Sequence, residues 1–248
     1  YHTTPSYTML SFENGLYTMA VVDSSGVYLG IGKAPTKKQA EQYAAREALA
    51  KWRMNEAVDT ILSEVGADTY FGWLTGKGNF RYDLAKTAPY KGTRVAPKPA
   101  HYIALREHLM IKYGFMMTEG LEADDAVAIA CYSLPEDEMI MVHIDKDLNQ
   151  LRGWHYNYRK KEKYHITEFE GLMNFYIQIL TGDRIDNIIG IKGIGPVKAQ
   201  RILEECKTEK EMYLACLEAY EGNEERVLEN GRLLWILREP KQIWTPPS

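Results

Sequence analysis

The sequence predicts an α/β fold built mainly on parallel strands, preceded by a small α+β module. In residues 1–52, hydrophobic segments alternate with polar residues and are separated by turn sequences, which is typical of antiparallel hairpins. From Arg53 onward, helical patterns alternate with short buried strands, which is typical of a parallel sheet covered on both faces. The 248 residues are 45% hydrophobic, which is enough for a substantial core.

The first 52 residues form the predicted β-β-β-α module. Its three strands are expected at residues 7–12, 16–22 and 27–31. Asn14-Gly15 and Ser24-Ser25-Gly26 between them are sequences that favour hairpin turns. A capping box at Thr36 to Gln39 then opens a helix. The apolar stripe of this helix consists of Ala40, Ala44, Ala45, Ala48, Leu49 and Trp52.

Residues 53–180 are predicted to form the α/β region and residues 181–248 a helical region with glycine-rich turns. A long loop or arch is expected at about 76–113, because its first part is rich in Gly, Pro and Lys. The expected helices cover about 54–65, 100–113 and 122–133, and the expected strands about 69–74 and 139–144. The last of these strands leads directly into Asp145.

Composition narrows the class of protein. The net charge of −4 and the pI near 5.9 argue against a surface that is basic throughout, although nucleic acid can still bind locally. The three cysteines show no disulfide or zinc pattern, so we expect buried thiols in a reducing, cytoplasmic compartment, and no membrane association. The chain opens with Tyr1 rather than Met, which suggests a fragment of a longer protein.

Seven carboxylates fall in three short segments: Glu122, Asp124 and Asp125; Asp145 and Asp147; Asp183 and Asp186. The first group begins a predicted helix, where acidic side chains suit the positive end of the helix dipole. The second follows a buried strand, at the edge where open α/β sheets bind ligands. The third pair has the i, i+3 spacing that places two side chains on one face of a helix.

Clustered carboxylates are the ligands that Mg²⁺ and Mn²⁺ prefer, so the sequence predicts a divalent-metal site. Two such ions about 4 Å apart can polarise a phosphodiester and lower the pKa of an attacking water. We therefore predict metal-dependent phosphodiester hydrolysis by in-line water attack. His143 precedes Asp145 on the buried strand and is interpreted as structural rather than catalytic.

The segment from Gly190 to Ala199 predicts a phosphate-binding turn. Glycines alternate with apolar residues and are followed by Pro196 in the first turn of a helix. Such turns let backbone N–H groups and a helix N-terminus approach an anion. The residues expected to bind DNA phosphate here are Lys192, Gly193, Gly195 and Lys198.

A second basic group lies in the expected arch, at Arg81, Lys86, Lys91 and Arg94. Phe80, Tyr82 and Tyr90 alternate with these cations. Aromatic rings between cations can stack bases while the cations hold phosphates, which suits single-stranded or flapped DNA ends.

Across about residues 54–248 the sequence resembles the phage and bacterial 5′-to-3′ exonuclease and flap endonuclease family. The matching segments are Asn79-Phe80-Arg81, Tyr90 to Arg94, Glu122 to Asp125, Asp145-Lys146-Asp147, Gly182 to Asn187, and Gly193-Ile194-Gly195. The resemblance implies a Rossmann-like 5′-nuclease fold with a helical arch and a helix-three-turn-helix that holds duplex DNA. It implies cleavage of DNA at 5′ ends, flaps or single-strand to duplex junctions.

The same resemblance assigns roles to individual residues. It implies that Glu122, Asp124, Asp125 and Asp145 serve chiefly a first metal ion, and that Asp147, Asp183 and Asp186 serve a second. It makes Lys91, Arg94 and Arg81 the catalytic basic residues that steer the phosphate. It also implies a K⁺ ion at the helix-three-turn-helix, beside the turn that contains Gly193, Gly195 and Lys198.

Residues 1–52 depart from that family and resemble a double-stranded-RNA-binding domain without its first helix. The resemblance rests on Pro5 to Tyr7, Gly30 to Lys33 and Thr36 to Ala45. It implies that Lys33, Lys37 and Lys38 contact the phosphates of duplex RNA. Members of the nuclease family carry a metal-binding Asp directly after their first strand. An alternative interpretation is that residues 19–23 form this first strand and that Asp23 is the metal ligand.

Two further functions remain open on the sequence alone. One is a protein that binds branched nucleic acid but cuts poorly, because the Asp of the first strand is absent. The other is an RNase that acts on RNA or hybrid duplexes, which the N-terminal resemblance favours.

Overall fold

The computed structural model describes residues 5–248, and these residues form two compact units. The first contains the described residues up to Phe71 together with Pro97–Phe115. The second contains Gly72–Ala96 and Met116–Ser248. Each unit is described by itself.

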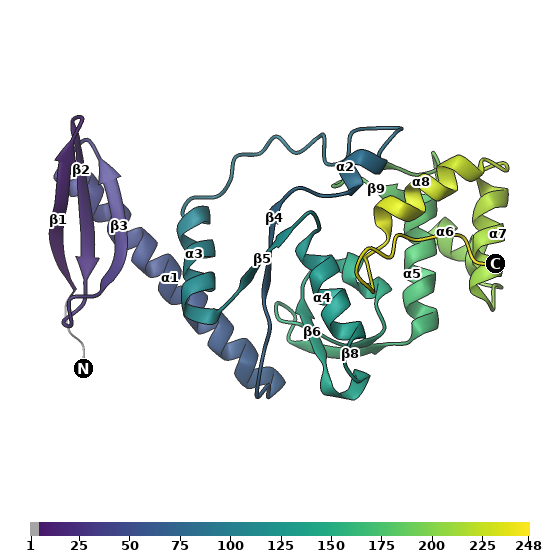
Figure 1. The fold of residues 1–248 in the computed structure, drawn as a ribbon, viewed down its shortest axis with the longest axis horizontal. Helices are drawn as coiled ribbons and strands as arrows, with labels where there is room; N and C mark the ends of the chain where they lie inside the picture. Colours follow the sequence, from purple (N-terminus) through teal and green to yellow (C-terminus); the bar gives the residue numbers. More distant parts are fainter. Residues whose placement is uncertain (1–4) are drawn as a thin grey trace. The chain divides into compact units, whose positions relative to one another are not determined.

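The first unit begins with the predicted three-stranded antiparallel sheet (Figure 1). Its strands, in the order β1-β2-β3, are β1 (Ser6–Glu13), β2 (Leu16–Val22) and β3 (Tyr28–Ala34). Asn14 and Gly15 both have positive φ, as the tight hairpin turn between β1 and β2 requires. The prediction of three strands from alternating hydrophobicity is confirmed.

Helix α1 (Lys37–Val65) packs closely on β3 and β2. Thr36 caps it, its side chain accepting a hydrogen bond from the backbone N–H of Gln39 at 3.3 Å. A Cβ on Gly32 would come within 2.1 Å of the carbonyl oxygen of Ala40, so only glycine permits this approach of strand and helix. Ala40 and Ala44 are fully buried at the contact.

One helix replaces the two that were expected, because α1 continues without a break from Lys37 to Val65. The expected boundary at residue 52 therefore lies inside a helix. Nothing in the sequence there is a helix breaker, and the helix ends only at Gly66, in the left-handed conformation. Helix α3 (Tyr102–Tyr113) packs against α1, and the Tyr113 hydroxyl donates to Asn55 at 3.0 Å.

The second unit contains several short pairings rather than one continuous parallel sheet, which corrects the expectation. β4 (Trp73–Lys77) pairs in parallel with β5 (Met116–Glu119). β6 (Ile140–His143) pairs in parallel with β7 (Gly153–Asn157), and β7 pairs antiparallel with β8 (Glu162–Ile166). β9 (Gly182–Asp183) and β10 (Ile188–Ile189) form a short antiparallel ladder. Such short strands bury little surface, so helices supply most of the core.

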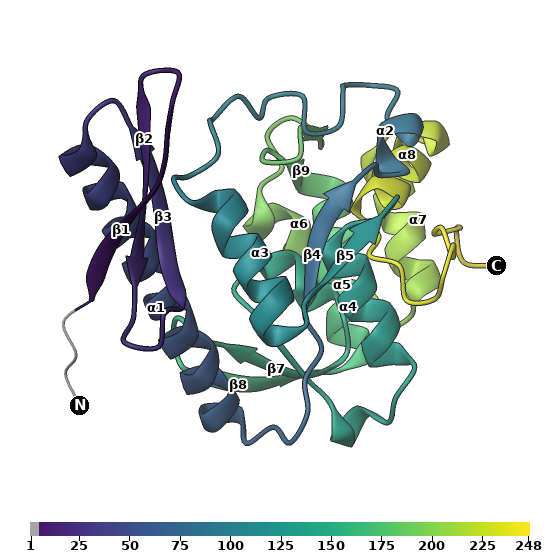
Figure 2. The same ribbon diagram turned by 60° about the vertical axis from the view of Figure 1, so that its left-hand side comes forward.

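Helix α5 (Glu168–Thr181) lies at the centre of that core and contacts three C-terminal helices (Figures 1 and 2). Phe175, Tyr176, Ile179 and Leu180 of this helix are completely buried. The surrounding helices are α6 (Pro196–Leu203), α7 (Glu209–Ala219) and α8 (Glu224–Leu234). Burying four large side chains on one helix stabilises the fold by several kcal/mol, at about 1.5–3 kcal/mol each.

The remaining elements connect this core to the strands. They are α2 (Arg81–Leu84), α4 (Ala123–Tyr132) and two 3-10 helices, η1 (Glu136–Glu138) and η2 (Lys146–Gln150). Cys131, Cys206 and Cys216 are free thiols, and burial raises the pKa of Cys131 to about 12. None of the helices in residues 5–248 is both long and apolar enough to span a bilayer.

Candidate metal and phosphate site

Acidic side chains from all three predicted segments line one pocket in the second unit. Its lining includes Glu122, Asp124, Asp147, Asp183 and Asp186, together with Arg81 and Tyr90. Asp145 borders this group, since its Oδ1 accepts the backbone N–H of Asp147 at 3.0 Å and its charge acts on Asp124. The fold therefore gathers acidic residues that lie up to 64 positions apart in the sequence.

Local structure explains how each acidic segment reaches the pocket. Glu122 is the N-cap residue of α4, as expected for an acid at the positive end of a helix. Asp145 caps η2 just after β6, at the carboxyl end of a strand as predicted. Asp183 and Asp186 do not lie on a helix, which corrects that prediction. They lie at the two ends of the turn between β9 and β10, where Asp183 Oδ1 accepts the N–H groups of Ile185 and Asp186.

One part of the pocket carries uncompensated negative charge. Burial, with Asp145 and Glu122 nearby, raises the pKa of Asp124 to about 6. Burial, with Asp145 and Asp183 nearby, raises the pKa of Asp147 to about 7. Sequence reasoning missed Gln178 on α5, whose amide donates to Asp147 Oδ1 at 2.6 Å, and no signal in the sequence marked it.

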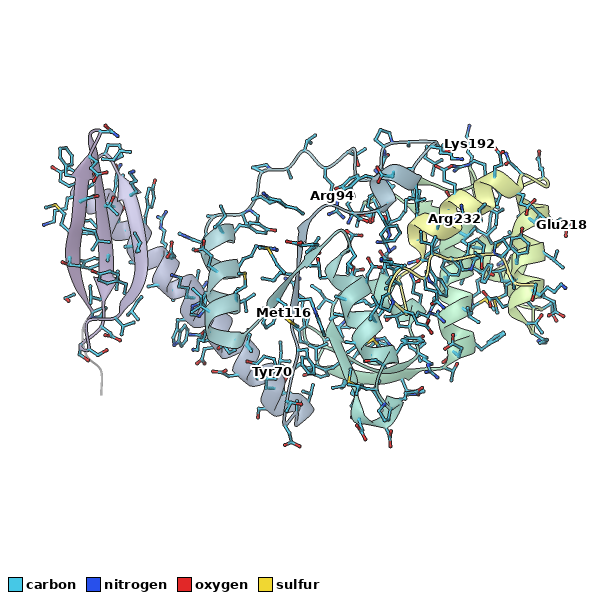
Figure 3. All side chains as sticks on the ribbon, viewed as in Figure 1. Tyr70, Arg94, Met116, Lys192, Glu218 and Arg232 are labelled. Atoms are coloured by element: carbon cyan, nitrogen blue, oxygen red, sulfur yellow. The ribbon has the colours of Figure 1, made fainter. Side chains whose placement is uncertain are left out.

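The other part of the pocket is neutralised by the segment that follows α2. The Lys91 ammonium is hydrogen-bonded to Glu122 and lies 3.6 Å from Asp186. The guanidinium of Arg94, labelled in Figure 3, is 2.6 Å from Asp186 Oδ1. The two predicted phosphate-steering residues therefore contact the acidic cluster itself.

Tyr90 has a different role from the base stacking that was expected. It is only 4% exposed, and its hydroxyl lies 2.7 Å from both Glu122 Oε2 and Asp186 Oδ2. Burial between two carboxylates raises the pKa of this phenol far above its usual value. Tyr90 thus bridges two acidic segments instead of contacting DNA, whereas Tyr82 is 56% exposed and remains accessible.

Arg81 and Asp125 form a buried pair. Two guanidinium nitrogens of Arg81 lie 2.8 Å from the two oxygens of Asp125, and the exposed fractions of the residues are 3% and 0%. Arg81 also donates to the carbonyls of Leu233 and Trp235, and Asp125 accepts from the N–H groups of Leu237 and Glu122. These contacts fix the pair in the core, while Arg81 also lies 3.7 Å from Glu122 at the wall of the pocket. The catalytic role predicted for Arg81 and the metal role predicted for Asp125 stay predictions.

The carboxylate oxygens of this pocket are the kind of ligand that a hard dication such as Mg²⁺ prefers. Within residues 5–248, no three His, Cys, Asp or Glu side chains are already gathered into a metal cage. The oxygens are nevertheless in one pocket, where burial first and neighbouring carboxylates second raise the pKa values of Asp124 and Asp147. Asp124, Asp145, Asp147 and Asp183 are the side chains best placed to hold a cation.

Two histidines support the turn that carries Asp145. His143 Nδ1 lies 2.7 Å from the Asp145 carbonyl, and His143 Nε2 lies 2.7 Å from Nδ1 of the fully buried His155. His155 in turn stacks on Tyr164 and lies 3.0 Å from the Leu151 carbonyl. These contacts fit the structural interpretation of His143.

The predicted phosphate-binding turn directly precedes α6 and presents open backbone. Gly193 has a φ of +83°, and a Cβ on Gly195 would meet nothing within 4 Å. The Lys198 ammonium donates to the Gly193 carbonyl at 2.9 Å, which closes the turn. Lys192, labelled in Figure 3, is exposed.

The other predicted site residues lie outside this cluster. The side chain of Lys86 makes none of the described contacts, while its backbone N–H donates to Glu229 at 2.7 Å. Asp23 uses Oδ1 to accept the N–H groups of Ser25 and Val27 in the β2–β3 turn. Since β2 is the middle strand of an antiparallel sheet, the alternative that made it the first strand of the nuclease is wrong.

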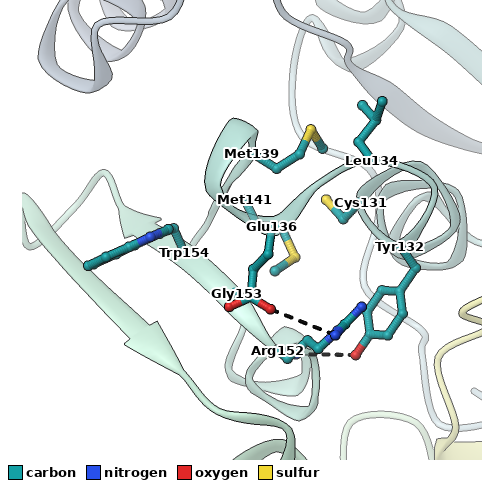
Figure 4. Close-up of a pocket in the computed structure, with 9 residues that line it drawn as sticks. All are labelled: Cys131, Tyr132, Leu134, Glu136, Met139, Met141, Arg152, Gly153 and Trp154. Atoms are coloured by element: carbon teal, nitrogen blue, oxygen red, sulfur yellow. Dashed lines mark hydrogen bonds and ion pairs between the residues drawn. The ribbon is translucent and has the colours of Figure 1, made fainter.

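A second pocket, between α4 and β7, carries no comparable cluster (Figure 4). Its two charged residues, Glu136 and Arg152, lie 3.8 Å apart, and the Tyr132 hydroxyl accepts the backbone N–H of Arg152. Most of the remaining lining is apolar, including Leu134, Met139 and Met141. The acidic pocket is therefore the candidate functional site.

Comparison with known proteins gives sequence relatives among DNA polymerases. DNA polymerase I of Rhizobium leguminosarum is 31% identical over 151 residues, which cover 51% of this chain and 14% of that protein. Thermostable DNA polymerase I of Thermus aquaticus is 35% identical over 131 residues, which cover 47% of this chain and 16% of that protein. The chain thus matches about a seventh of the length of these relatives, and no family model matches it.

Solved structures with the same fold come from bacteriophage T5. The T5 5′-exonuclease with bound zinc has a TM-score of 0.55 at 19% identity and covers 74% of this chain and 80% of that chain. The T5 flap endonuclease in complex with DNA and metal ions has a TM-score of 0.56 at 18% identity, with the same coverage. The α/β fold is therefore shown, and the resemblance to 5′-to-3′ exonucleases and flap endonucleases is confirmed.

Proposed function

We propose that this chain, whose fold is that of the phage 5′-exonucleases, is a divalent-metal-dependent 5′ nuclease. Its substrate is DNA with a 5′ end, a flap or a junction between single strand and duplex. The observation that carries the proposal is the single pocket lined by Glu122, Asp124, Asp147, Asp183 and Asp186. The phage proteins of similar fold, named as a flap endonuclease and a 5′-exonuclease, support the same reaction, and the sequence relatives are DNA polymerases.

The acidic residues would hold Mg²⁺ or Mn²⁺, with two ions as the expected number. Bound there, such ions polarise a phosphodiester and lower the pKa of water. Asp145 and Asp147 are held by their turn at the end of β6, and Gln178 orients the Asp147 carboxylate. Asp183 is held by two backbone N–H groups of its own turn.

Lys91 and Arg94 would bind the phosphate next to the cleaved bond. Both lie at the edge of the acidic pocket on a segment whose backbone is fixed, since the Lys91 N–H donates to the Asp186 carbonyl at 2.8 Å. A guanidinium binds phosphate through two parallel hydrogen bonds, while an ammonium acts as a point charge. The exposed Lys86 would add charge along the path of the DNA.

The duplex part of the substrate would lie on the turn before α6, as in a helix-three-turn-helix. Open backbone at Gly193 and Gly195 and the free start of an eight-residue helix suit a phosphate. Lys192 would add charge, and Lys198 would stabilise the turn. We extend the proposal to a K⁺ ion at this turn, on the strength of the resemblance alone.

Replacing Gly195 tests the duplex contact. We expect Gly195→Leu to fold normally, because a side chain there meets open space, and to weaken binding of flap DNA about tenfold by blocking close approach of the backbone to phosphate. Fluorescence anisotropy at fixed salt measures this change. As a control, Thr245→Leu, which adds an apolar side chain at an exposed position of the C-terminal segment, should leave affinity unchanged; equal affinity of both variants would contradict the proposed contact.

The β1–α1 module is proposed to bind duplex RNA or to serve as a packing or partner surface. Lys33, Lys37 and Lys38 are exposed near the start of α1, where the helix dipole also favours phosphate. Residues 1–52 carry five Lys or Arg and four Asp or Glu, so the attraction to a polyanion is local. The cytoplasm of a bacterial or phage-infected cell is the proposed location, because the polymerase relatives are bacterial.

The decisive experiment is a Mn²⁺ titration of the whole chain against a labelled 5′-flap DNA. We expect metal-dependent release of the flap strand. Binding without cleavage at any metal concentration would contradict the proposal and favour the branched-DNA-binding alternative. Matched DNA, RNA and hybrid flaps decide the substrate, since a clear preference for RNA would favour the RNase alternative.

A further inference from the structure

The acidic pocket is divided into two parts that differ in charge compensation. Glu122 and Asp186 are paired with Lys91 and Arg94, and we call these two acids the neutralised pair. The remaining acids, which we call the uncompensated group, are Asp124, Asp145, Asp147 and Asp183. Among the described residues, the one ion pair found for this group joins Asp147 to Lys146 at 3.9 Å, and the Lys146 side chain is 71% exposed.

The contacts of the neutralised pair use the same oxygens that a cation would need. Lys91 contacts Glu122 Oε1, Arg94 contacts Asp186 Oδ1, and the Tyr90 hydroxyl contacts the other oxygen of each acid. The Glu122 and Lys91 side chains are only 13% and 14% exposed, so solvent screens this ion pair weakly. A dication can bind these oxygens only after the basic groups move away.

The basic side chains can leave without moving their backbone. Asn187 donates to the Pro89 carbonyl, and the Lys91 N–H donates to the Asp186 carbonyl, so the chain around Lys91 is anchored beside the β9–β10 turn. The lysine ammonium is carried on a flexible four-carbon stem. The Arg94 side chain is 51% exposed and is therefore accessible to an incoming phosphate.

We propose that Lys91 and Arg94 are counter-ions that close the neutralised pair to divalent metal in the DNA-free protein, and that a DNA phosphate opens it by drawing these side chains away. This inference rests on the proposed function. It makes full metal loading of the pocket dependent on substrate. Lys91 thereby has two opposite effects, favouring phosphate binding and opposing metal binding.

Mn²⁺ binding to the DNA-free chain tests the inference without measuring activity. Free Mn²⁺ is counted by electron paramagnetic resonance in wild type, Lys91→Ala and Lys91→Met, the last of which keeps the apolar stem. We expect wild type to show one class of tight Mn²⁺ sites and one class of weak sites. In both Lys91 variants, the weak sites should bind Mn²⁺ about tenfold more tightly, because close charge pairs couple on at least this scale. Lys160→Ala, which removes an exposed lysine in the β7–β8 turn, should change neither class.

A second measurement adds a flap DNA made resistant to cleavage by phosphorothioate linkages. It should tighten the weak class in wild type and have little effect on that class in Lys91→Ala. Unchanged or weaker Mn²⁺ binding in the Lys91 variants, or two equally tight classes in wild type, would overturn the counter-ion inference alone. Absence of Mn²⁺ binding to every protein tested would overturn the proposed nuclease function as well.

Discussion

Asp147→Asn is expected to abolish cleavage and, at the same time, to stabilise the folded protein. The carboxylate is proposed as a metal ligand, so its loss should slow cleavage by more than the about 10- to 100-fold typical of losing an outer partner of a ligand. In the free protein, however, its charge is costly, because it is partly buried beside Asp145 and Asp183. An amide keeps the acceptor for Gln178 and removes that charge.

The direction of the expected stability change follows from the pKa of Asp147 in the folded and unfolded states. The ordinary pKa of the group is 3.8, and burial beside other carboxylates raises the pKa of Asp147 in the folded state to about 7. Ionisation of Asp147 therefore destabilises the folded state relative to the unfolded state. The effect is absent below about pH 4, where the group is protonated in both states, and complete above about pH 7, where it is ionised in both. We expect Asp147→Asn to raise the free energy of unfolding by about 1 kcal/mol or more at pH 8, with no gain near pH 3.5.

Thermal unfolding at several pH values and cleavage of a 5′-flap DNA check both parts. Asp137→Asn is the matched control, because it removes the same charge from an exposed residue in η1. It should alter neither stability nor cleavage. A variant of Asp147 that cuts at the wild-type rate would remove this residue from the metal site.

Arg81→Met is expected to destabilise the second unit by about 3–5 kcal/mol, the cost of leaving a buried charge unpaired. Asp125 is completely buried and receives two hydrogen bonds from Arg81, so the substitution leaves its carboxylate without a counter-ion. Two C-terminal carbonyls, of Leu233 and Trp235, lose their donors as well. Chemical denaturation monitored by tryptophan fluorescence measures the loss.

Two controls separate this effect from loss of a catalytic group. Arg94→Met breaks an ion pair whose arginine is half exposed, so it should cost about 1 kcal/mol or less. Combining Arg81→Met with Asp125→Leu should recover part of the stability, because no unpaired charge remains. An Arg81→Met protein as stable as wild type would show that the pair has no structural role.

Local sequence patterns were good guides where the structure is decided locally. Alternating hydrophobicity and Asn14-Gly15 predicted the hairpin sheet, and a buried run before Asp145 predicted a strand that delivers this residue to the pocket. The helix after Glu122 was also predicted, since acids at a helix start are a local preference. The end of α1 was not, because no residue near position 52 interrupts the helix.

Residue type and spacing did not reveal which acidic side chains lack a basic partner. Asp124 and Asp125 are neighbours, yet one is left with a raised pKa and the other is buried against Arg81. The difference depends on which side of α4 faces α2 and the C-terminal segment, and that is set by packing. The bridging contacts of Tyr90 and the contact of Gln178 with Asp147 could not be predicted for the same reason, since the partners lie far away in the sequence.

The sequence by itself determined that this chain carries three acidic segments, a glycine-rich turn and a basic segment in an α/β order, because backbone preferences and residue chemistry act over short distances. Only the tertiary structure decided how these charges pair. The division between Asp147, left uncompensated, and Asp186, neutralised by Arg94, arises from contacts between segments that are separate in the chain. Electrostatic energy depends on distance in space and on burial, and neither is encoded in the spacing of residues along the sequence.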